Sequence, residues 1–275
     1  EERIQGGPIG EGERAGSTLR IGREETAAEL GFIGPTRNSL DTVASRDAAL
    51  EYLSNTAITM VHLSRLAEEL VLWSTAEFGF IELADAYSTG SSLMPQKRNP
   101  DVAELARGKS GRLAGNLTTM ITLLKGLPTG YNRDLQEDKE ALFDTVDTLD
   151  LTLPPVAGAV ETATFVPERM LEVMNAQLLA TDLADYLVRR GVPFRTTHEV
   201  VGRLVRKSED SGVSLSELPL DAMKAEHEAF EQDVAEVFDW FRSVDARDSD
   251  GGTSLRAVRD QLQEVATRLA ELENP

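Results

Sequence analysis

Apolar residues recur in steps of three and four along residues 42–75, and this period limits the fold more than any other feature of the chain. The stripe comprises Leu50, Leu53, Ala57, Met60, Leu63, Ala67 and Leu70. Such spacing predicts one long helix that buries a single face. A helix of about 30 residues would be about 45 Å long, which is too long for a compact monomer. The pattern therefore favours a helical bundle that subunits share.

Capping residues and prolines mark the ends of the neighbouring helices. Asn38–Asp41 offers N-cap residues for the long helix. A second helix is expected from Asn99, as N-cap with Pro100 in its first turn, to about residue 124. A third is expected over 135–163, with a kink or a break at Pro154–Pro155.

The second helix combines a leucine stripe with three glycines. The stripe predicted on its buried side comprises Leu105, Leu113, Leu117, Met120 and Leu124. Each of the glycines at 108, 111 and 115 costs about 1 kcal/mol relative to alanine in a helix interior. We interpret them as positions where neighbouring backbones come close; the alternative is simply a weak helix.

The remaining chain predicts shorter helices near 179–190, 195–209, 216–240 and 253–273, and no convincing set of strands. The fold class is therefore all-α. We expect residues 1–166 to form part of a central helical bundle and residues 167–275 to form a small C-terminal helical domain.

Charge and composition exclude several partners. The 275 residues include 47 Asp and Glu against 28 Lys and Arg, a formal charge of −19. No basic patch is evident, which argues against nucleic acid, and an anionic membrane surface would repel the chain. Such acidity suggests a high-salt cytoplasm, where at about 1 M salt a Debye length of roughly 3 Å screens self-repulsion. The alternative is a mesophilic protein that is merely acidic.

Several signals of export or anchoring are missing from the sequence. The chain has no cysteine, so it has no disulfide framework and no thiolate nucleophile. It has no apolar run of 18 or more residues and no visible signal peptide. These features fit a cytoplasmic protein.

The segment Gly90-Ser-Ser-Leu-Met-Pro-Gln-Lys-Arg-Asn99 carries the most chemistry. Glycine allows unusual loop conformations, and a serine near Lys97, Arg98 and a helix N-terminus could act as a base if its alkoxide is favoured. The alternative is a polar loop before a helix cap.

This segment resembles the signature loop of the fumarase/aspartase superfamily, Gly-Ser-x-x-Met-Pro-x-Lys-x-Asn. All six fixed residues are present: Gly90, Ser91, Met94, Pro95, Lys97 and Asn99. Gln96 and a second block, residues 125–139, are similar to the argininosuccinate lyase family in particular. The resemblance runs from the Pro-Ile-Gly near residue 8 to the Gly-Gly-Thr at 251–253.

The resemblance implies a reaction and an assembly. The family cleaves argininosuccinate to arginine and fumarate by β-elimination, as part of arginine biosynthesis and the urea cycle. Its members are homotetramers with a central helical bundle, and each active site draws segments from three subunits. The family needs no metal or organic cofactor, and small-molecule argininosuccinate is the expected partner.

The same resemblance assigns roles in the signature loop. Ser91 is the expected base, and Lys97 the cation that stabilises the aci-carboxylate in the transition state. Ser92 and Gln96 are expected near the substrate. Asn99 is either a substrate contact or only the helix cap.

The second block supplies Tyr131, Gln136 and Lys139, which match substrate-binding positions of the family. Their hydroxyl, amide and ammonium groups suit a substrate with several carboxylates; the alternative is a solvated helix face. We also expect Arg46 and Asp47 near the site. The chain's histidines, His62, His198 and His227, are interpreted as structural.

The chain begins Glu1-Glu-Arg-Ile and aligns with roughly the C-terminal half of the family. Glu104 matches a glutamate that pairs with a family histidine, and the N-terminal segment with that histidine's motif is absent from this chain. Three alternatives remain open: another elimination of the superfamily such as adenylosuccinate cleavage, a structural relative without activity, and an inactive fragment.

Overall fold

The computed structural model describes residues 6–7, 18, 21–90, 94 and 98–273. The chain divides into two compact units, Glu1–Leu171 and Glu172–Pro275. Among the described residues, every strand is two residues long, and none of the helices is long and apolar enough to cross a membrane. The predicted all-α class is confirmed.

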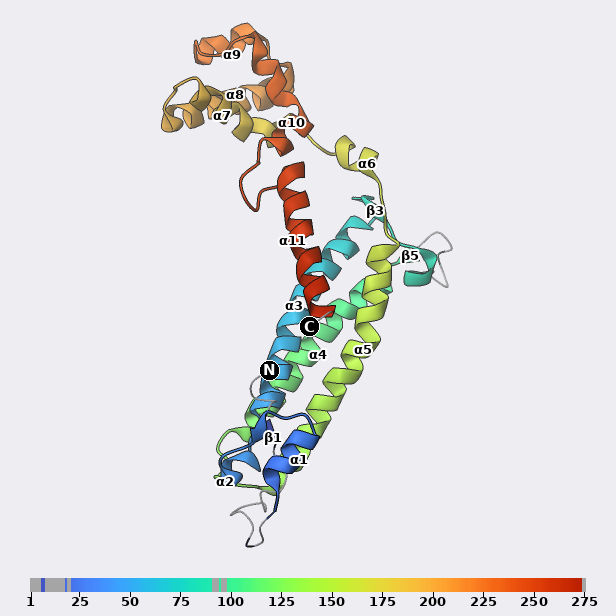
Figure 1. Ribbon diagram of the computed structural model, residues 1–275. Coiled ribbons are helices and arrows are strands. Elements are labelled where there is room, and N and C mark those ends of the chain that lie inside the picture. Colours follow the sequence, from blue (N-terminus) through green and yellow to red (C-terminus); the bar gives the residue numbers. More distant parts are fainter. Residues whose placement is uncertain (1–5, 8–17, 19–20, 91–93, 95–97, 274–275) are drawn as a thin grey trace. The chain divides into compact units, whose positions relative to one another are not determined.

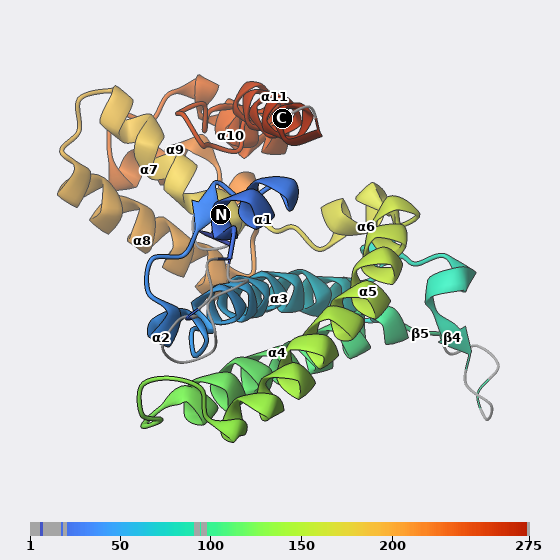
Figure 2. The same cartoon turned by 60° about the horizontal axis from the view of Figure 1, so that its bottom comes forward.

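Three long helices form the body of the first unit: α3 (Asp47–Trp73), α4 (Asp101–Leu124) and α5 (Asp138–Glu161). They lie side by side, with β5 near one end of the group and the short helices α1 (Arg23–Glu29) and α2 (Ser39–Thr42) near the other (Figures 1 and 2). The predicted stripe of α3 is largely right, because Leu53, Ala57, Met60, Ala67 and Leu70 are buried.

Two apolar clusters hold these helices together. One joins α3, α4 and α5 at the end near β5 through Ala67, Leu70, Ile81, Leu83, Ala103, Ala106 and Val156. The other lies at mid-length and comprises Met60, Leu113 and Leu149. In the first cluster, alanines at 67, 103 and 106 supply small side chains where α3 and α4 pack together.

Short strand pairs close the connections. β3 (Ile81–Glu82) pairs antiparallel with β6 (Thr164–Phe165), and β4 (Thr89–Gly90) pairs antiparallel with β5 (Arg98–Asn99). β1 (Gly6–Gly7) pairs parallel with β2 (Gly34–Pro35). The 3-10 helices η1 (Asp85–Tyr87) and η2 (Arg133–Glu137) precede β4 and α5.

Two predicted helix starts are wrong. The Asn38 side chain accepts hydrogen bonds from the backbone N–H of Leu40 and Asp41 at 3.0 and 3.1 Å, so it caps the short α2 rather than α3. Pro100, not Asn99, occupies the N-cap of α4, because Asn99 is already paired in β5.

The expected break in α5 is also wrong, since the helix continues through Pro154 and Pro155. The carbonyls that lose their N–H partners belong to Asp150 and Leu151, and both residues are exposed. Water can satisfy those carbonyls, which lowers the cost of an internal proline.

On α4 the predicted stripe is largely right, since Leu117 and Leu124 are half-buried and two further members are buried. Ala103, Ala106, Leu113 and Met120 are buried, whereas Leu105 is 60% exposed. A Cβ added at any of the three glycines would meet no atom within 4 Å in the part of the chain that the structure describes. The close approach of backbones expected at these glycines is therefore not made among the described residues.

The second unit is a small helical domain around its own core. Helix α6 (Pro167–Glu172) crosses the boundary between the two units. The elements after it are η3 (Ala176–Leu179), α7 (Ala180–Arg189), α8 (Phe194–Ser211), η4 (Leu215–Glu217), α9 (Leu220–Glu226), η5 (Gln232–Phe238), α10 (Trp240–Asp245) and α11 (Leu255–Glu273). Leu183, Leu187, Leu204, Leu215 and Phe230 are fully buried there. The single helix expected over 216–240 is wrong, because α9, η5 and α10 divide that region.

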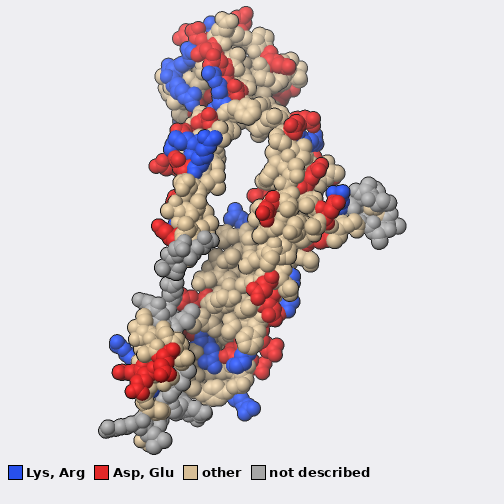
Figure 3. All heavy atoms as spheres, turned by 45° about the vertical axis from the view of Figure 1, so that its right-hand side comes forward, with Lys and Arg blue, Asp and Glu red and all other residues tan. Residues whose placement is uncertain are grey.

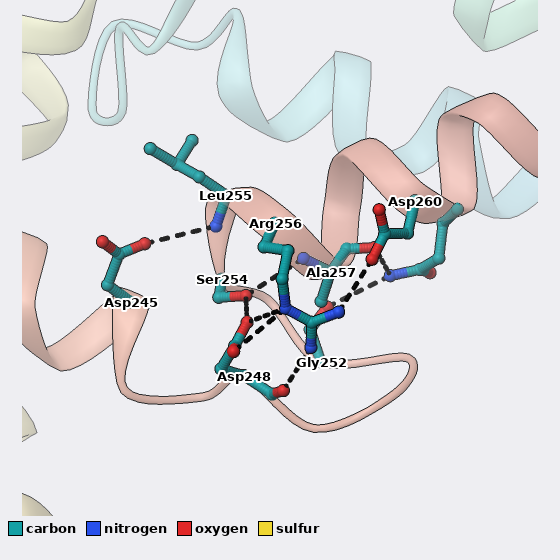
Figure 4. Close-up of polar contacts among 9 residues, drawn as sticks. Asp245, Asp248, Gly252, Ser254, Leu255, Arg256, Ala257 and Asp260 are labelled. Carbon is teal, nitrogen blue, oxygen red and sulfur yellow. Dashed lines mark hydrogen bonds and ion pairs between the residues drawn. The ribbon is translucent and has the colours of Figure 1, made fainter.

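A polar network starts α11. Ser254 Oγ accepts a hydrogen bond from the N–H of Ala257 at 3.1 Å, and Asp248 accepts one from Arg256 Nε at 2.9 Å (Figure 4). A side chain at Gly252 would collide with the Arg247 carbonyl. Thus the Gly-Gly-Thr turn is shaped by local packing in this unit.

Candidate active site

The described flanks of the signature loop form a two-stranded hairpin. Thr89 pairs with Asn99 and Gly90 with Arg98, so the two ends of the loop stand side by side directly before α4. Ser91, Ser92, Gln96 and Lys97 lie outside the described residues, and their predicted roles stay predictions.

Polar contacts tie this hairpin to its surroundings. Arg98 Nη1 lies 2.6 Å from Asp85 Oδ1 in η1, and Thr89 Oγ1 donates a hydrogen bond to the carboxylate of Asp101 in the first turn of α4. The Arg98 and Asp85 side chains are mostly exposed, so this ion pair contributes little stability by itself. The polar contacts that hold the hairpin are therefore exposed to water, which weakens them.

Asn99 lies half-buried beside a pocket of about 370 Å³. Glu82, Ser88 and Arg98 contribute polar groups to the same pocket. Since Asn99 does not cap α4, the cap alternative fails and the substrate-contact alternative is kept.

Glu104 is exposed on the first turn of α4. Close to it, Arg107 forms an ion pair with Glu68 of α3, and both side chains are nearly half exposed. A hydrogen bond to Glu68 is the main cause of the raised pKa of Arg107, with a smaller contribution from the charge of Glu104. The pairing of Glu104 with a histidine stays a prediction.

The second cluster of candidate residues surrounds Asp138, the first residue of α5. Its side chain is buried, at 7% relative exposure, yet it binds two cations: Arg46 through Nε, and Lys139 through Nζ at 2.6 Å. Burial raises the pKa of Asp138, but the hydrogen bonds from Lys139 and Arg46 outweigh it and hold the pKa below its ordinary value. The carboxylate is thus ionised and fixes both cations.

Two further predicted residues meet in the same region. Gln136 Nε2 donates a hydrogen bond to Tyr131 Oη. Just beside them, Arg46 and Asp47 line a pocket of about 310 Å³ together with Gly130 and Leu135. The structure therefore brings Arg46, Asp47 and most of the second block into one neighbourhood.

Sequence reasoning missed Asp138, although a signal was available. Buried positions of η2 and α5 follow one another in steps of three and four: Leu135, Asp138, Ala141, Thr145, Thr148 and Thr152. A carboxylate on a buried helical stripe needs a cationic partner. This spacing of three and four residues predicts that Asp138 is buried and that its neighbours Glu137 and Glu140 are exposed.

The two clusters lie at opposite ends of α4. The hairpin precedes the helix and the second block follows it, and 24 helical residues correspond to about 36 Å. The seven residues between β4 and β5 could reach at most about 12 Å from their paired ends. One copy of the chain therefore does not bring its signature loop to its own second block.

Among the described residues, no three His, Asp or Glu side chains are grouped so that they could hold a metal ion. That no cofactor is needed stays an expectation of the resemblance.

Comparisons with known proteins agree on one family. A family model described as "Lyase" matches residues 1–115, and one described as "Argininosuccinate lyase C-terminal" matches residues 177–245. The curated argininosuccinate lyase of Herpetosiphon aurantiacus is 56% identical over 264 residues, which are 96% of this chain and 58% of that protein.

Solved structures show the same fold. An EDDS lyase in complex with formate has a TM-score of 0.88 and 29% identity, over 98% of this chain and 56% of that one. A class II fumarase from Schistosoma mansoni, at 22% identity, has a TM-score of 0.60 over 75% of this chain and 43% of its own, and this likeness shows the fold alone.

Fold and comparisons together place the chain in the mainly helical fumarase/aspartase superfamily. Within it, the chain belongs to the argininosuccinate lyase family. The chain spans about 58% of the length of the curated relative that it matches.

Proposed function

We propose that this chain carries the signature loop and second block of an argininosuccinate lyase, which converts argininosuccinate to arginine and fumarate. The observation that carries the proposal is the signature itself. All six fixed residues are present, in a chain 56% identical to a curated member of the family. The hairpin under the loop and the helix N-terminus behind it suit a site where negative charge develops.

The chemistry needs a base, a cation and an acid. Ser91 takes the proton from carbon, and its alkoxide form is favoured when the loop sheds water. Lys97 stabilises the aci-carboxylate that results. The carbon–nitrogen bond then breaks, its electron pair stays on nitrogen, and a general acid protonates the leaving group. Glu104 orients the histidine with which its counterpart in the family pairs.

The second block holds the substrate. Tyr131 and Gln136 are hydrogen-bonded to each other, and Lys139 is fixed by Asp138, so their polar groups are arranged before a ligand arrives. Pre-arranged groups lose less entropy on binding carboxylates. Ser92, Gln96 and Asn99 contact the substrate from the loop side.

The active form is a homotetramer with shared sites. Within one chain, the length of α4 separates the signature loop from the second block. A second copy of the chain therefore supplies the other half of each site. The long helices also leave large apolar side chains exposed: Ile58, Val61, Leu105, Ile121, Phe143 and Leu151. Figure 3 shows wide stretches of the helical body of the first unit without acidic or basic side chains. Such surfaces are typical of subunit interfaces.

The natural environment is a cytoplasm with high salt. The charge of −19 repels itself at low ionic strength and is screened at high ionic strength.

Fumarate release from argininosuccinate tests the function. The chain is assayed in molar KCl, alone and after it is joined to the N-terminal portion of the Herpetosiphon relative. We expect release in at least the joined form and its loss in Ser91→Ala, while Ser216→Ala, which removes an exposed hydroxyl in η4 of the second unit, leaves the rate unchanged. Undiminished release in Ser91→Ala would contradict the role of Ser91.

Another elimination of the superfamily is the second candidate. The likeness to EDDS lyase over 98% of the chain favours keeping it. Assays with argininosuccinate, adenylosuccinate and EDDS in parallel separate the two, and a higher kcat/KM for either of the last two substrates would replace the first proposal.

A further inference from the structure

We infer that Gly158 of α5 is a positioning residue for the signature loop. The ring of Tyr87 packs against the bare backbone at Gly158, and this contact, called the seat below, fixes the base of the β4–β5 hairpin. The inference rests on the proposed function only where it concerns turnover. The seat itself is a structural claim about residues that the structure describes.

The packing at Gly158 leaves no room for a side chain. A Cβ built there would stand closer than 3.0 Å to three atoms of Tyr87: Oη, Cζ and Cε1. Real Cβ atoms do not approach other atoms so closely, so the ring of Tyr87 lies against the bare backbone of α5. An alanine would force the ring to swing away or η1 to shift, and either movement removes the contact.

Nothing else in the described part of the chain requires a glycine at position 158. It lies inside a continuous helix and is absent from the glycines that adopt positive φ. A glycine there weakens the helix relative to alanine. The glycines at 108, 111, 115 and 202 also lie in helices, but a Cβ at any of them would meet no atom of the described residues within 4 Å. Tyr87 is what sets Gly158 apart.

Tyr87 is well placed to transmit this contact. It ends η1, and β4 begins two residues later. In the same short segment, Asp85 forms the ion pair with Arg98 of β5 at 2.6 Å. η1 is therefore linked to both strands of the hairpin, and Tyr87 links η1 to α5. Because the ion pair of Asp85 with Arg98 is exposed, we assign the packing of Tyr87 against α5 the main part in holding the base of the hairpin.

The loss of the seat should loosen the hairpin without unfolding the unit. β3 and β6 pair on the far side of η1 and still hold the chain to the segment after α5. The buried cluster of Ala67, Ala106 and Val156 does not include Tyr87. A changed loop position can thus be separated from general damage.

Four variants test the inference: Gly158→Ala, Tyr87→Ser, the double variant, and Gly202→Ala as the control for helix propensity. Serine at 87 is too short to reach α5, so alanine at 158 fits in the double variant. Hydrogen exchange is measured on residues 84–90 and 98–101, together with thermal unfolding.

We expect exchange of these segments to speed up by about tenfold in each single variant, and no further in the double variant, since both changes remove the same contact. Gly202→Ala should leave this exchange unchanged. Unchanged exchange in Gly158→Ala, or effects that add in the double variant, would overturn the inference.

Turnover supplies the second readout in an active form of the enzyme. The loop carries Ser91 and Lys97 together with the proposed substrate contacts Ser92 and Gln96, whereas Tyr131 and Lys139 lie at the other end of α4. We therefore expect kcat to fall by about tenfold or more and KM to rise by a smaller factor. An unchanged kcat with faster exchange would refute the positioning role. If the unmodified enzyme releases no fumarate, the proposed function fails. Hydrogen exchange alone then still tests whether Gly158 and Tyr87 hold the hairpin.

Discussion

The two ends of α4 are built differently. At its N-terminal end the signature hairpin is held by exposed contacts, such as the pair of Arg98 and Asp85. At its C-terminal end the second block is organised around the buried carboxylate of Asp138, which binds Arg46 and Lys139. One end of the helix is thus lightly held and the other is firmly fixed.

This difference matches a division of labour in elimination chemistry. A base and a cation that act on the reacting carbon need a loop that can close and shed water. Groups that hold carboxylates are most useful when they are already in place. The predictions below test whether the two ends differ in this way.

The largest effect on stability is expected at the fixed end. Asp138→Asn removes the charge that compensates Arg46 and Lys139, and should lower the free energy of unfolding by about 3 kcal/mol. Urea denaturation measures it. Asp147→Asn, an exposed aspartate on the same helix, is the control and should change little. Equal stability of the two variants would show that the Asp138 cluster is not firmly held.

The largest effect on turnover is expected at the loop end. Lys97→Met should lower kcat by about a hundredfold or more, as the removal of one preorganised donor does. Steady-state assays of fumarate formation measure it in the active form. Lys224→Met, at an exposed lysine of α9, is the matched control. Near-normal turnover in Lys97→Met would remove Lys97 from the mechanism.

Acid should weaken the fixed end selectively. The folded-state pKa of Asp138 is lowered, so its contribution to stability is present above the unfolded pKa of about 3.9 and is lost as pH falls through the folded value. Below about pH 4 the stability of the unmodified chain should therefore fall more steeply than that of Asp138→Asn. Thermal unfolding between neutral pH and acid checks this; parallel curves would contradict it.

The smallest effect is expected at the exposed pair of the hairpin. Asp85→Asn removes an ion pair whose partners are both mostly exposed, and should leave the unfolding midpoint in urea unchanged within error. A loss as large as that of Asp138→Asn would end the contrast between the two ends.

Salt acts on both ends through the net charge. We expect the helical circular dichroism signal to be weaker at low KCl than at about 2 M KCl, because the higher concentration screens the repulsion within a chain of charge −19. A signal that does not depend on salt would favour the alternative of a merely acidic mesophilic protein.

The sequence predicted the long helices well because their stripes reflect burial inside one chain. The start of α3 was misplaced, since capping residues look alike whether they begin a short helix or a long one. Asn99 was assigned a cap because Asn-Pro-Asp suits a helix start, and the two-residue pairing with Thr89 leaves no pattern in the sequence. Of the leucine stripe predicted on α4, Leu105 alone was misplaced, since it is exposed while Leu113 and Met120 are buried.

The candidate site was predictable in parts but not as a whole. Motif residues could be named, and the length of α4 already implied that loop and second block are far apart. Asp138 was missed because charge was read as exposure, although its period was that of buried neighbours. The contact of Tyr87 with Gly158 depends on the packing of η1 against α5, which no local pattern records.

The central claim is that a complete site needs the loop of one copy and the second block of another. Mixed refolding of Ser91→Ala with Lys139→Met tests it most directly, with fumarate release as the readout, in a form whose unmodified chain is active. Each variant alone should be nearly inactive, and random assembly should restore about a quarter of the unmodified activity, since half of the loops and half of the blocks are intact. A mixture no more active than either variant would contradict the account, because it would place both halves of every site in one chain.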